Sequence, residues 1–335
     1  MTRIAVVGAG AIGGLLAARL TRAGAEVSLF ARGATLETLR RDGLRLIERD
    51  GTVGEALRLA ASDDAAALGV QDYVVLALKA QALPALAPRL AALIGPASWI
   101  VSATNGLPWW FLQGLSSAIA NQRLDVVDPQ GGVSATLPPA RAIGCVVHLG
   151  ASTDSPGVVR HRAGNRLILG APGGPDTPAQ GAAWALRELL AKGGFDAEHS
   201  LRIQHEIWLK LWGNMNMNPI SALTGSTMDV LLDDPLMQGL IRRMMEEAAA
   251  VGERLGLPVD MSIDARMRVT RELGAFKTSM LQDAEAGREL EIDPILGVFP
   301  ELGRRLGVPV PFCEAVLGLL RQRAANWAAA RRAGA

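Results

Sequence analysis

The sequence is poor in the residues that build disulfide frameworks, metal clusters and nucleic-acid surfaces. Its 335 residues include 2 cysteines and 4 histidines, and Cys145 and Cys313 lie far apart in the chain. This pattern excludes a disulfide framework and lacks the ligand spacing of a metal site. One tyrosine, 6 phenylalanines and a net charge of +1 leave little for base stacking or for attracting an anionic polymer. We expect a cytoplasmic protein that binds neither metal nor nucleic acid.

Long apolar runs are missing as well. The sequence holds no stretch of about 18 uncharged apolar residues, the length that a membrane-spanning helix requires, and it begins with a strand-like run instead of a signal peptide. Hydrophobic residues make up 49% and charged residues 20%, which is enough for buried cores. At 335 residues we expect a compact soluble protein of about two domains, with no membrane partner.

A glycine-rich loop follows the first apolar run. Residues 4–7 read as a parallel strand buried on both faces, residues 15–23 as an Ala/Leu-rich helix and residues 26–30 as a second strand. This context makes the G-x-G-x-x-G pattern typical of a dinucleotide-binding unit, in which a pyrophosphate approaches the backbone at the helix N-terminus. A glycine turn with a structural role only is the alternative. The residues assigned to cofactor binding are Gly8, Ala9, Gly10, Ala11, Ile12 and Gly13.

The residue after the second strand favours one cofactor over the other. A carboxylate at this place accepts a hydrogen bond from the ribose 2′-hydroxyl of NAD and repels the 2′-phosphate of NADP. The chain has Arg32 here instead. We therefore expect NADP(H), with a free surface arginine as the alternative.

Two further strands deliver polar residues to the edge where ligands of open α/β sheets bind. The run over residues 72–78 ends in Lys79 and Gln81, and the run over residues 99–103 ends in Asn105-Gly106. We assign Lys79, Gln81 and Asn105 to cofactor binding; for Asn105 a turn without a ligand is the alternative. Residues 44–48 and 56–60 are expected to form a hairpin around Asp50-Gly51.

The pattern changes towards short β-branched segments and then to helices. Segments 145–149, 157–161 and 166–169 predict an antiparallel extension, and residues 180–192 a helix followed by a strand at 195–198. Beyond residue 200 we expect helices at 201–218, 234–255, 262–284, 293–306 and 311–331. The predicted domains are residues 1–199, of the Rossmann type, and residues 200–335, all helical.

One helix of the second domain carries a polar stripe. Lys210, Asn214 and Asn218 follow each other at i, i+4 and i+8 and share a helix face beside Leu211 and Met215. A buried polar stripe costs free energy unless a polar partner lies against it, and a substrate is such a partner. By itself the pattern is more typical of a solvated face.

A second polar cluster lies between residues 277 and 293. Ser279 can bind a carboxylate and Glu291 can face a substrate pocket, but Glu289, Glu291 and Asp293 by pattern alone are typical of a solvated face.

The combination of these motifs resembles the ketopantoate reductase family over nearly the whole chain. The motifs are Lys210-x-x-x-Asn214-x-x-x-Asn218-Pro219-x-Ser-Ala-Leu223, Ser279-Met-Leu-Gln-Asp283 and Gly287-Arg-x-x-Glu291-Ile-Asp293. The glycine loop, Arg32, the strand end at Lys79 and Gln81, and the Asn105-Gly106 turn occur in the family's order.

The resemblance implies an α/β protein with a Rossmann-type N-terminal domain and an all-helical C-terminal domain. It implies that NADPH delivers hydride to the ketone of 2-dehydropantoate, a step of pantothenate biosynthesis. By matching position, Lys210 is the catalytic general acid and Glu291 helps to hold the substrate. Asn105, Asn214, Asn218 and Ser279 then bind hydroxyl and carboxylate groups of this small 2-oxo acid; a homodimer is left open.

Three departures from the family leave the substrate open. Met228 and Phe276 stand where polar residues are expected, and residues 109–111 read Trp-Trp-Phe, either aromatic bulk near the cofactor or core. The alternatives are a reductase or dehydrogenase of another 2-oxo or 2-hydroxy acid and a non-catalytic NADP-binding sensor.

Overall fold

The computed structural model describes residues 1–333 and divides into two compact units. The first contains Met1–Thr104, Pro108–Gly114 and Asp128–Glu206, and the second contains Asn105–Leu107, Leu115–Val127 and Ile207–Ala335. The chain therefore leaves the first unit more than once before the second unit's long helical part. A domain boundary at residue 200 stays a prediction.

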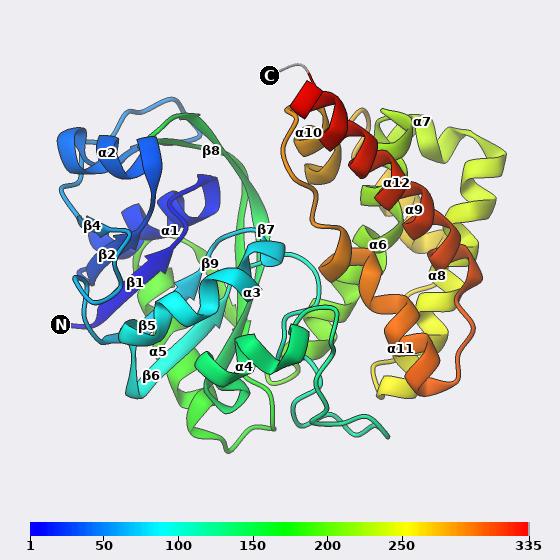
Figure 1. Cartoon of the computed structure of the whole chain (residues 1–335), viewed down its shortest axis with the longest axis horizontal. Helices are drawn as coiled ribbons and strands as arrows, with labels where there is room; N and C mark the ends of the chain where they lie inside the picture. Colours follow the sequence, from blue (N-terminus) through cyan, green and yellow to red (C-terminus); the bar gives the residue numbers. More distant parts are fainter. Residues whose placement is uncertain (334–335) are drawn as a thin grey trace. The chain divides into compact units, whose positions relative to one another are not determined.

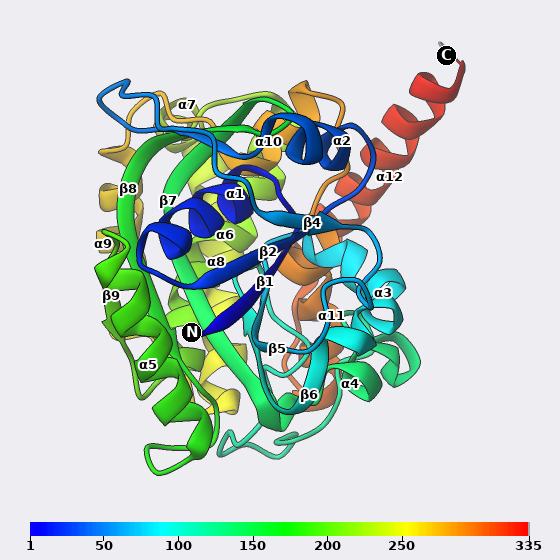
Figure 2. The same cartoon turned by 90° about the vertical axis from the view of Figure 1, so that its left-hand side faces the viewer.

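A parallel sheet with a Rossmann-like strand order forms the centre of the first unit (Figure 2). Its strands are β1 (Arg3–Val7), β2 (Glu26–Phe30), β4 (Ala60–Ser62), β5 (Gln71–Leu76) and β6 (Ile94–Ser102). They lie in the order β6-β5-β1-β2-β4, all parallel. The direction of the strand order changes at β1, so the carboxyl ends of β1 and β5 border the crevice where such sheets bind ligands. The predicted fold class is confirmed for this unit.

Burial explains why the apolar runs form these strands. Ile4, Ala5, Val6 and Val7 are 0% exposed, because helices cover both faces of a parallel sheet. The crossovers are α1 (Ala11–Arg22), α2 (Gly33–Asp42) and the short helical turns η1 (Ala80–Ala82), α3 (Leu83–Leu86) and η2 (Ala87–Leu93). Pro84 and Pro88 lie at the starts of the last two turns, where a missing N–H costs no helical hydrogen bond.

The prediction that residues 44–48 and 56–60 pair with each other as the two strands of a hairpin is wrong. β3 (Arg45–Ile47) pairs in parallel with β8 (Val158–Gly170), whereas β4 pairs in parallel with β2. Only isolated antiparallel bridges, Leu44 to Leu57 and Ile47 to Val53, join the two arms. Each arm therefore joins a different edge of the nine-stranded sheet, a choice that local sequence does not reveal.

The antiparallel extension is confirmed, with two long strands in place of three segments. β7 (Ala142–Ser155) and β8 (Val158–Gly170) pair antiparallel, and they run side by side as the longest strands in Figure 2. Gly157, with a φ of +74°, forms the turn between them. α5 (Pro178–Lys192) and β9 (Asp196–His199) follow, and β9 pairs in parallel with β8. The predicted helix and strand at this place are confirmed.

The aromatic segment after the Asn-Gly turn belongs to the core of the first unit. Trp109, Trp110 and Phe111 are 5%, 1% and 0% exposed. The indole of Trp109 donates to the carbonyl oxygen of Leu137, and that of Trp110 donates to the Ser102 hydroxyl. Satisfied indoles at this depth indicate packing and not ligand binding. Between this segment and β7 lie η3 (Pro129–Gly131), α4 (Gly132–Thr136) and η4 (Pro139–Arg141).

The second unit is helical, as predicted, and Figure 1 shows its helices from α6 to α12. They are α6 (Ile203–Thr224), α7 (Met228–Asp233), α8 (Pro235–Leu255), α9 (Ile263–Arg271), α10 (Ser279–Glu285), η5 (Asp293–Gly297), α11 (Val298–Leu306) and α12 (Pro311–Ala333). Within residues 1–333 no helix is long and apolar enough to cross a membrane.

Two helix predictions in the second unit are wrong. The single helix expected over residues 262–284 is interrupted after Arg271, and α10 begins anew at Ser279 with Thr278 as its cap. The first helix does not end at Asn218, because α6 continues through Pro219 to Thr224. Burial of Ile220 and Ala222, 2% and 3% exposed, offsets the hydrogen bond that the proline removes.

The glycine loop after β1 has two different steric situations. A Cβ on Gly13 would lie 1.8 Å from the carbonyl oxygen of Gly8, so helix α1 packs on the loop at a distance that only glycine permits. A Cβ on Gly10 would meet nothing within 4 Å. Gly10 has a φ of −80°, which any residue can adopt, so its missing side chain leaves open space at the N-terminus of α1.

This difference predicts separable effects of two alanine substitutions. Gly13→Ala should lower the melting temperature, because overpacking costs about 1–3 kcal/mol or more. Gly10→Ala should affect the melting temperature much less. If the predicted pyrophosphate approaches the backbone here, the added methyl group should weaken dinucleotide binding by at least about tenfold. Thermal unfolding and a dinucleotide titration of both variants measure this. Equal affinity of Gly10→Ala and the parent would contradict it.

Candidate active site

A hydrogen bond joins two of the predicted site residues, Lys210 and Asn105. The Nζ of Lys210 on α6 donates to the Oδ1 of Asn105 at 3.0 Å, and both side chains are half-buried. These residues are 105 positions apart in the sequence, and both belong to the second unit. The bond fixes the end of a long, flexible lysine side chain at one place.

The Asn105 turn is itself held by the backbone of η5. The N–H of Leu107 donates to the carbonyl oxygen of Pro294 at 2.8 Å. Gly106 has a φ of +79°, and a Cβ on it would lie 2.4 Å from the same carbonyl oxygen. Asn-Gly at this place is therefore required by the close approach of two chain segments as well as by the turn. The sequence analysis missed Pro294, because no local pattern connects it with residue 105.

The polar stripe on α6 is partly buried, so the interpretation of this stripe as a fully solvated face is wrong. Lys210 and Asn214 are half-buried and Asn218 is 3% exposed, beside Leu211 and Met215 at 2% and 0%. The Nδ2 of Asn218 is buried without a hydrogen-bond partner in the described part of the chain. A buried amide without a partner costs about 1–3 kcal/mol, which a ligand atom can recover.

Ser279 and Glu291 differ in their surroundings. Ser279 is exposed and begins α10, whereas Glu291 is 7% exposed. Glu289 is exposed, and Asp293 forms an ion pair with Arg321, so the solvated-face interpretation of the three acids is wrong for Glu291. A carboxylate this deep needs polar partners to stay charged.

Two residues outside the predicted set connect α10 to α6. The Thr278 hydroxyl accepts from the N–H of Leu281 and forms a hydrogen bond with the hydroxyl of Ser221. The Ser221 hydroxyl also contacts the carbonyl oxygen of Asn218. Thr278 and Ser221, 1% and 0% exposed, thus connect the start of the Ser279 helix with the end of the Lys210 stripe. The N-cap preference of threonine was the available signal for Thr278.

The predicted cofactor residues of the first unit lie around the carboxyl ends of β1, β2 and β5. Gly8, with a φ of +98°, follows β1, and Arg32, an exposed residue, begins α2 after β2. Gln81 follows β5, and both side-chain polar atoms of Gln81 are buried without a partner in residues 1–333. The open space at Gly10, the orphaned Gln81 amide and a cation at Arg32 together fit a phosphate-bearing dinucleotide. Lys79 precedes Gln81 at the same strand end.

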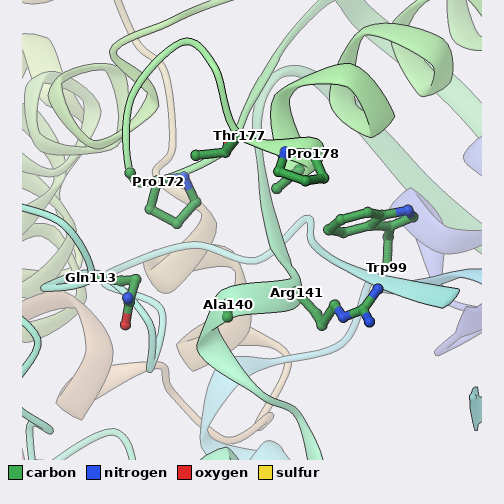
Figure 3. Close-up of a pocket in the computed structure, with 9 residues that line it drawn as sticks. Trp99, Gln113, Ala140, Arg141, Pro172, Thr177 and Pro178 are labelled. Carbon is green, nitrogen blue, oxygen red and sulfur yellow. The ribbon is translucent and has the colours of Figure 1, made fainter. Parts of the chain in front are cut away.

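Two other features of the described residues do not compete for this assignment. No cluster of three or more histidine, cysteine or acidic side chains in residues 1–333 could hold a metal. A pocket of about 510 Å³ in the first unit contains none of the predicted site residues (Figure 3). Its lining is mostly apolar, and the guanidinium of Arg141 lies 5.2 Å from the centre of the Trp99 ring. It therefore lacks acid–base groups for chemistry.

Two family models match the chain. The model described as "Ketopantoate reductase PanE/ApbA" matches residues 4–174, and the model described as "Ketopantoate reductase PanE/ApbA C terminal" matches residues 202–324. The match includes the glycine loop, Lys210 and Glu291.

Individual proteins agree with the family models. The 2-dehydropantoate 2-reductase of Mesorhizobium japonicum is 44% identical over 323 residues, 96% of this chain and 98% of that protein. A solved structure from Ralstonia solanacearum MolK2 is 48% identical with a TM-score of 0.91 and covers 97% of this chain and 98% of that one. The crystal structure of the 2-dehydropantoate 2-reductase of Geobacter metallireducens GS-15 is 26% identical, with a TM-score of 0.81 over 96% of this chain and 99% of that one.

The similarities to known proteins agree with the strand order of the first unit and with the helices of the second unit. The chain belongs to the ketopantoate reductase family, a family of oxidoreductases that act on CH–OH groups and whose Rossmann-like unit implies a nicotinamide cofactor.

Proposed function

We propose that the chain reduces the ketone of 2-dehydropantoate to the alcohol of pantoate with NADPH, a step of pantothenate biosynthesis in the cytoplasm. The observation that carries the proposal is the ammonium group of Lys210, fixed 3.0 Å from the amide oxygen of Asn105 at the edge of a half-buried polar stripe. The 44% identity to a 2-dehydropantoate 2-reductase supports the substrate.

Lys210 is the general acid in this proposal. Addition of hydride to a ketone develops negative charge on the carbonyl oxygen, which a cation within hydrogen-bond reach stabilises. The ammonium group then transfers a proton to that oxygen and leaves an alcohol. Asn105 holds the Nζ in place by accepting a hydrogen bond from it.

The other polar residues of the second unit hold the substrate. Asn214 and Asn218 offer amide groups on the turns of α6 that follow Lys210, and the unsatisfied Nδ2 of Asn218 can donate to a substrate oxygen. Ser279 offers a hydroxyl, and the buried Glu291 can accept from a substrate hydroxyl. Because the bound substrate is already oriented, less entropy is lost when the reaction step takes place.

The first unit holds the cofactor in this proposal. Bound NADPH supplies the hydride from its nicotinamide ring. The backbone over residues 8–13 receives the pyrophosphate, and Lys79 and Gln81 contribute polar contacts. The Arg32 guanidinium is exposed and has no hydrogen bond or ion pair to the described residues, so it is available for the 2′-phosphate.

A panel of 2-oxo acids tests the substrate. With NADPH we expect the highest kcat/KM for 2-dehydropantoate, and absorbance of the reduced cofactor measures each rate. A higher kcat/KM for an acid with another side chain would replace 2-dehydropantoate by that acid and leave the reaction type in place. No consumption of NADPH with any acid would favour a non-catalytic role.

Arg32→Asp should shift the preference of the enzyme from NADPH towards NADH. The carboxylate repels the 2′-phosphate of NADPH and can accept a hydrogen bond from the ribose of NADH. Removing one charge-assisted hydrogen bond to a phosphate should raise KM for NADPH by about tenfold or more. Arg32→Gln, which adds no repulsion, should lie between the parent and Arg32→Asp. A parent protein that prefers NADH would refute the role of Arg32.

Lys210→Ala should lower kcat by about 10²-fold to 10⁴-fold, the usual range for loss of a general acid. The dissociation constant of NADPH should stay close to the parent value, because Lys210 is not itself one of the predicted cofactor residues. Lys277→Ala is the matched control, since Lys277 is an exposed lysine of the same unit that pairs with Glu285. Full activity of Lys210→Ala would exclude the proposed role.

A further inference from the structure

The guanidinium of Arg266 lies against α6 in a notch, the space that the missing side chain of Gly213 leaves open. Arg266 belongs to α9, and a Cβ on Gly213 of α6 would lie 2.2 Å from its Nη2 and 2.9 Å from its Nε. Gly213 lies in the middle of the 22-residue helix α6, where neither a turn nor a helix cap requires a glycine. A glycine in a helix interior costs about 1 kcal/mol relative to alanine, so the space for Arg266 has to compensate for it.

This guanidinium has no protein partner. No hydrogen bond or ion pair joins the Arg266 side chain to another residue in 1–333, and its Nε is buried. Burial alone lowers the pKa of the Arg266 guanidinium, with no acidic group acting against it. Other arginines nearby are paired: Arg242 with Asp264 and Arg271 with Asp233. Asp264, the acid nearest to Arg266 in the sequence, is thus paired with another cation.

An uncompensated cation in such a place is costly for the protein alone. Arg266 is half-buried and its Nε is fully buried, so part of the hydration of the guanidinium is lost, and neither an acid nor a hydrogen bond from the described residues replaces it. An anionic ligand group supplies both. The cost is therefore more consistent with a binding role than with a contribution to folding stability.

The notch lies next to the proposed substrate residues. Gly213 is three residues after Lys210 and directly before Asn214, so it is on the turn of α6 that carries both. Arg266 therefore adds a second cation to the neighbourhood of Lys210, and it comes from a different helix.

We propose that Arg266 binds the carboxylate of the 2-oxo acid. This inference rests on the proposed function and deepens it. The planar guanidinium matches a carboxylate with two parallel hydrogen bonds, and it keeps its proton under all physiological conditions. The ammonium group of a lysine, in contrast, can transfer a proton to another atom. The two cations therefore have separate tasks: Arg266 holds the negative charge of the substrate, and Lys210 serves the ketone oxygen.

Arg266→Gln tests this assignment. With NADPH, KM for the 2-oxo acid should rise by about 10-fold to 100-fold, the loss expected for a charge-assisted hydrogen bond, while kcat and KM for NADPH change less than about threefold. The methyl ester of the same acid should be a poor substrate of the parent and lose no further efficiency in the variant. Arg266→Lys should recover part of the loss, because it restores the charge without the two-pronged geometry.

Two further variants separate binding from structure. Arg268→Gln removes an exposed arginine of the same helix and should keep the parent's KM. Gly213→Ala keeps Arg266 but displaces its guanidinium, so it should raise KM for the acid as Arg266→Gln does. Without ligand, Arg266→Gln should melt at the parent temperature or above it, because it removes an uncompensated charge. A structural role predicts a lower melting temperature.

The outcomes distinguish this proposal from the proposed function. If the parent reduces a 2-oxo acid and Arg266→Gln has the same KM for it, or if the acid and the ester lose efficiency equally, the role of Arg266 is refuted and the reductase remains. If the parent consumes NADPH with no acid of the panel, the proposed function fails first, and the role of Arg266 falls with it.

Discussion

The hydrogen bond between Lys210 and Asn105 is the constraint on which the candidate site depends. It requires α6 to present its polar stripe, the Asn105 turn to lie on η5, and Gly106 to approach the Pro294 carbonyl oxygen without a side chain. A lysine has four side-chain torsions, and a general acid has to keep its proton within about 3 Å of the reacting oxygen. One amide oxygen, held by backbone contacts, reduces the freedom of that side chain.

Glycines have a different task at each place in this protein. Gly13 lets α1 pack on the loop after β1, Gly10 leaves open space at the end of the same helix, and Gly213 makes room for a guanidinium. In the first case the missing side chain serves packing, in the second it leaves open space, and in the third it accommodates a charged side chain. Substitution by alanine separates these tasks, because the neighbouring atoms lie at different distances.

Much of the fold could be predicted from the sequence, since short apolar runs and glycine breaks are local. Such patterns predicted the strands β1 and β2 and the helical second unit. The pairing of β3 with β8 and of β4 with β2 could not be predicted, because each of the two strands has three residues and its own residues do not determine the neighbouring strand. Pro294, Ser221, Thr278 and Arg266 escaped for a related reason: their roles come from contacts with residues far away in the chain.

The bond between Ser221 and Thr278 has a consequence for the dynamics of the second unit. α10 has 7 residues, too few for a helix that is stable by itself in water. Its cap, however, is hydrogen-bonded to the buried end of the 22-residue helix α6. The start of α10 should therefore open together with the end of α6 in one cooperative step, and amide hydrogen exchange in the two segments should share one opening free energy.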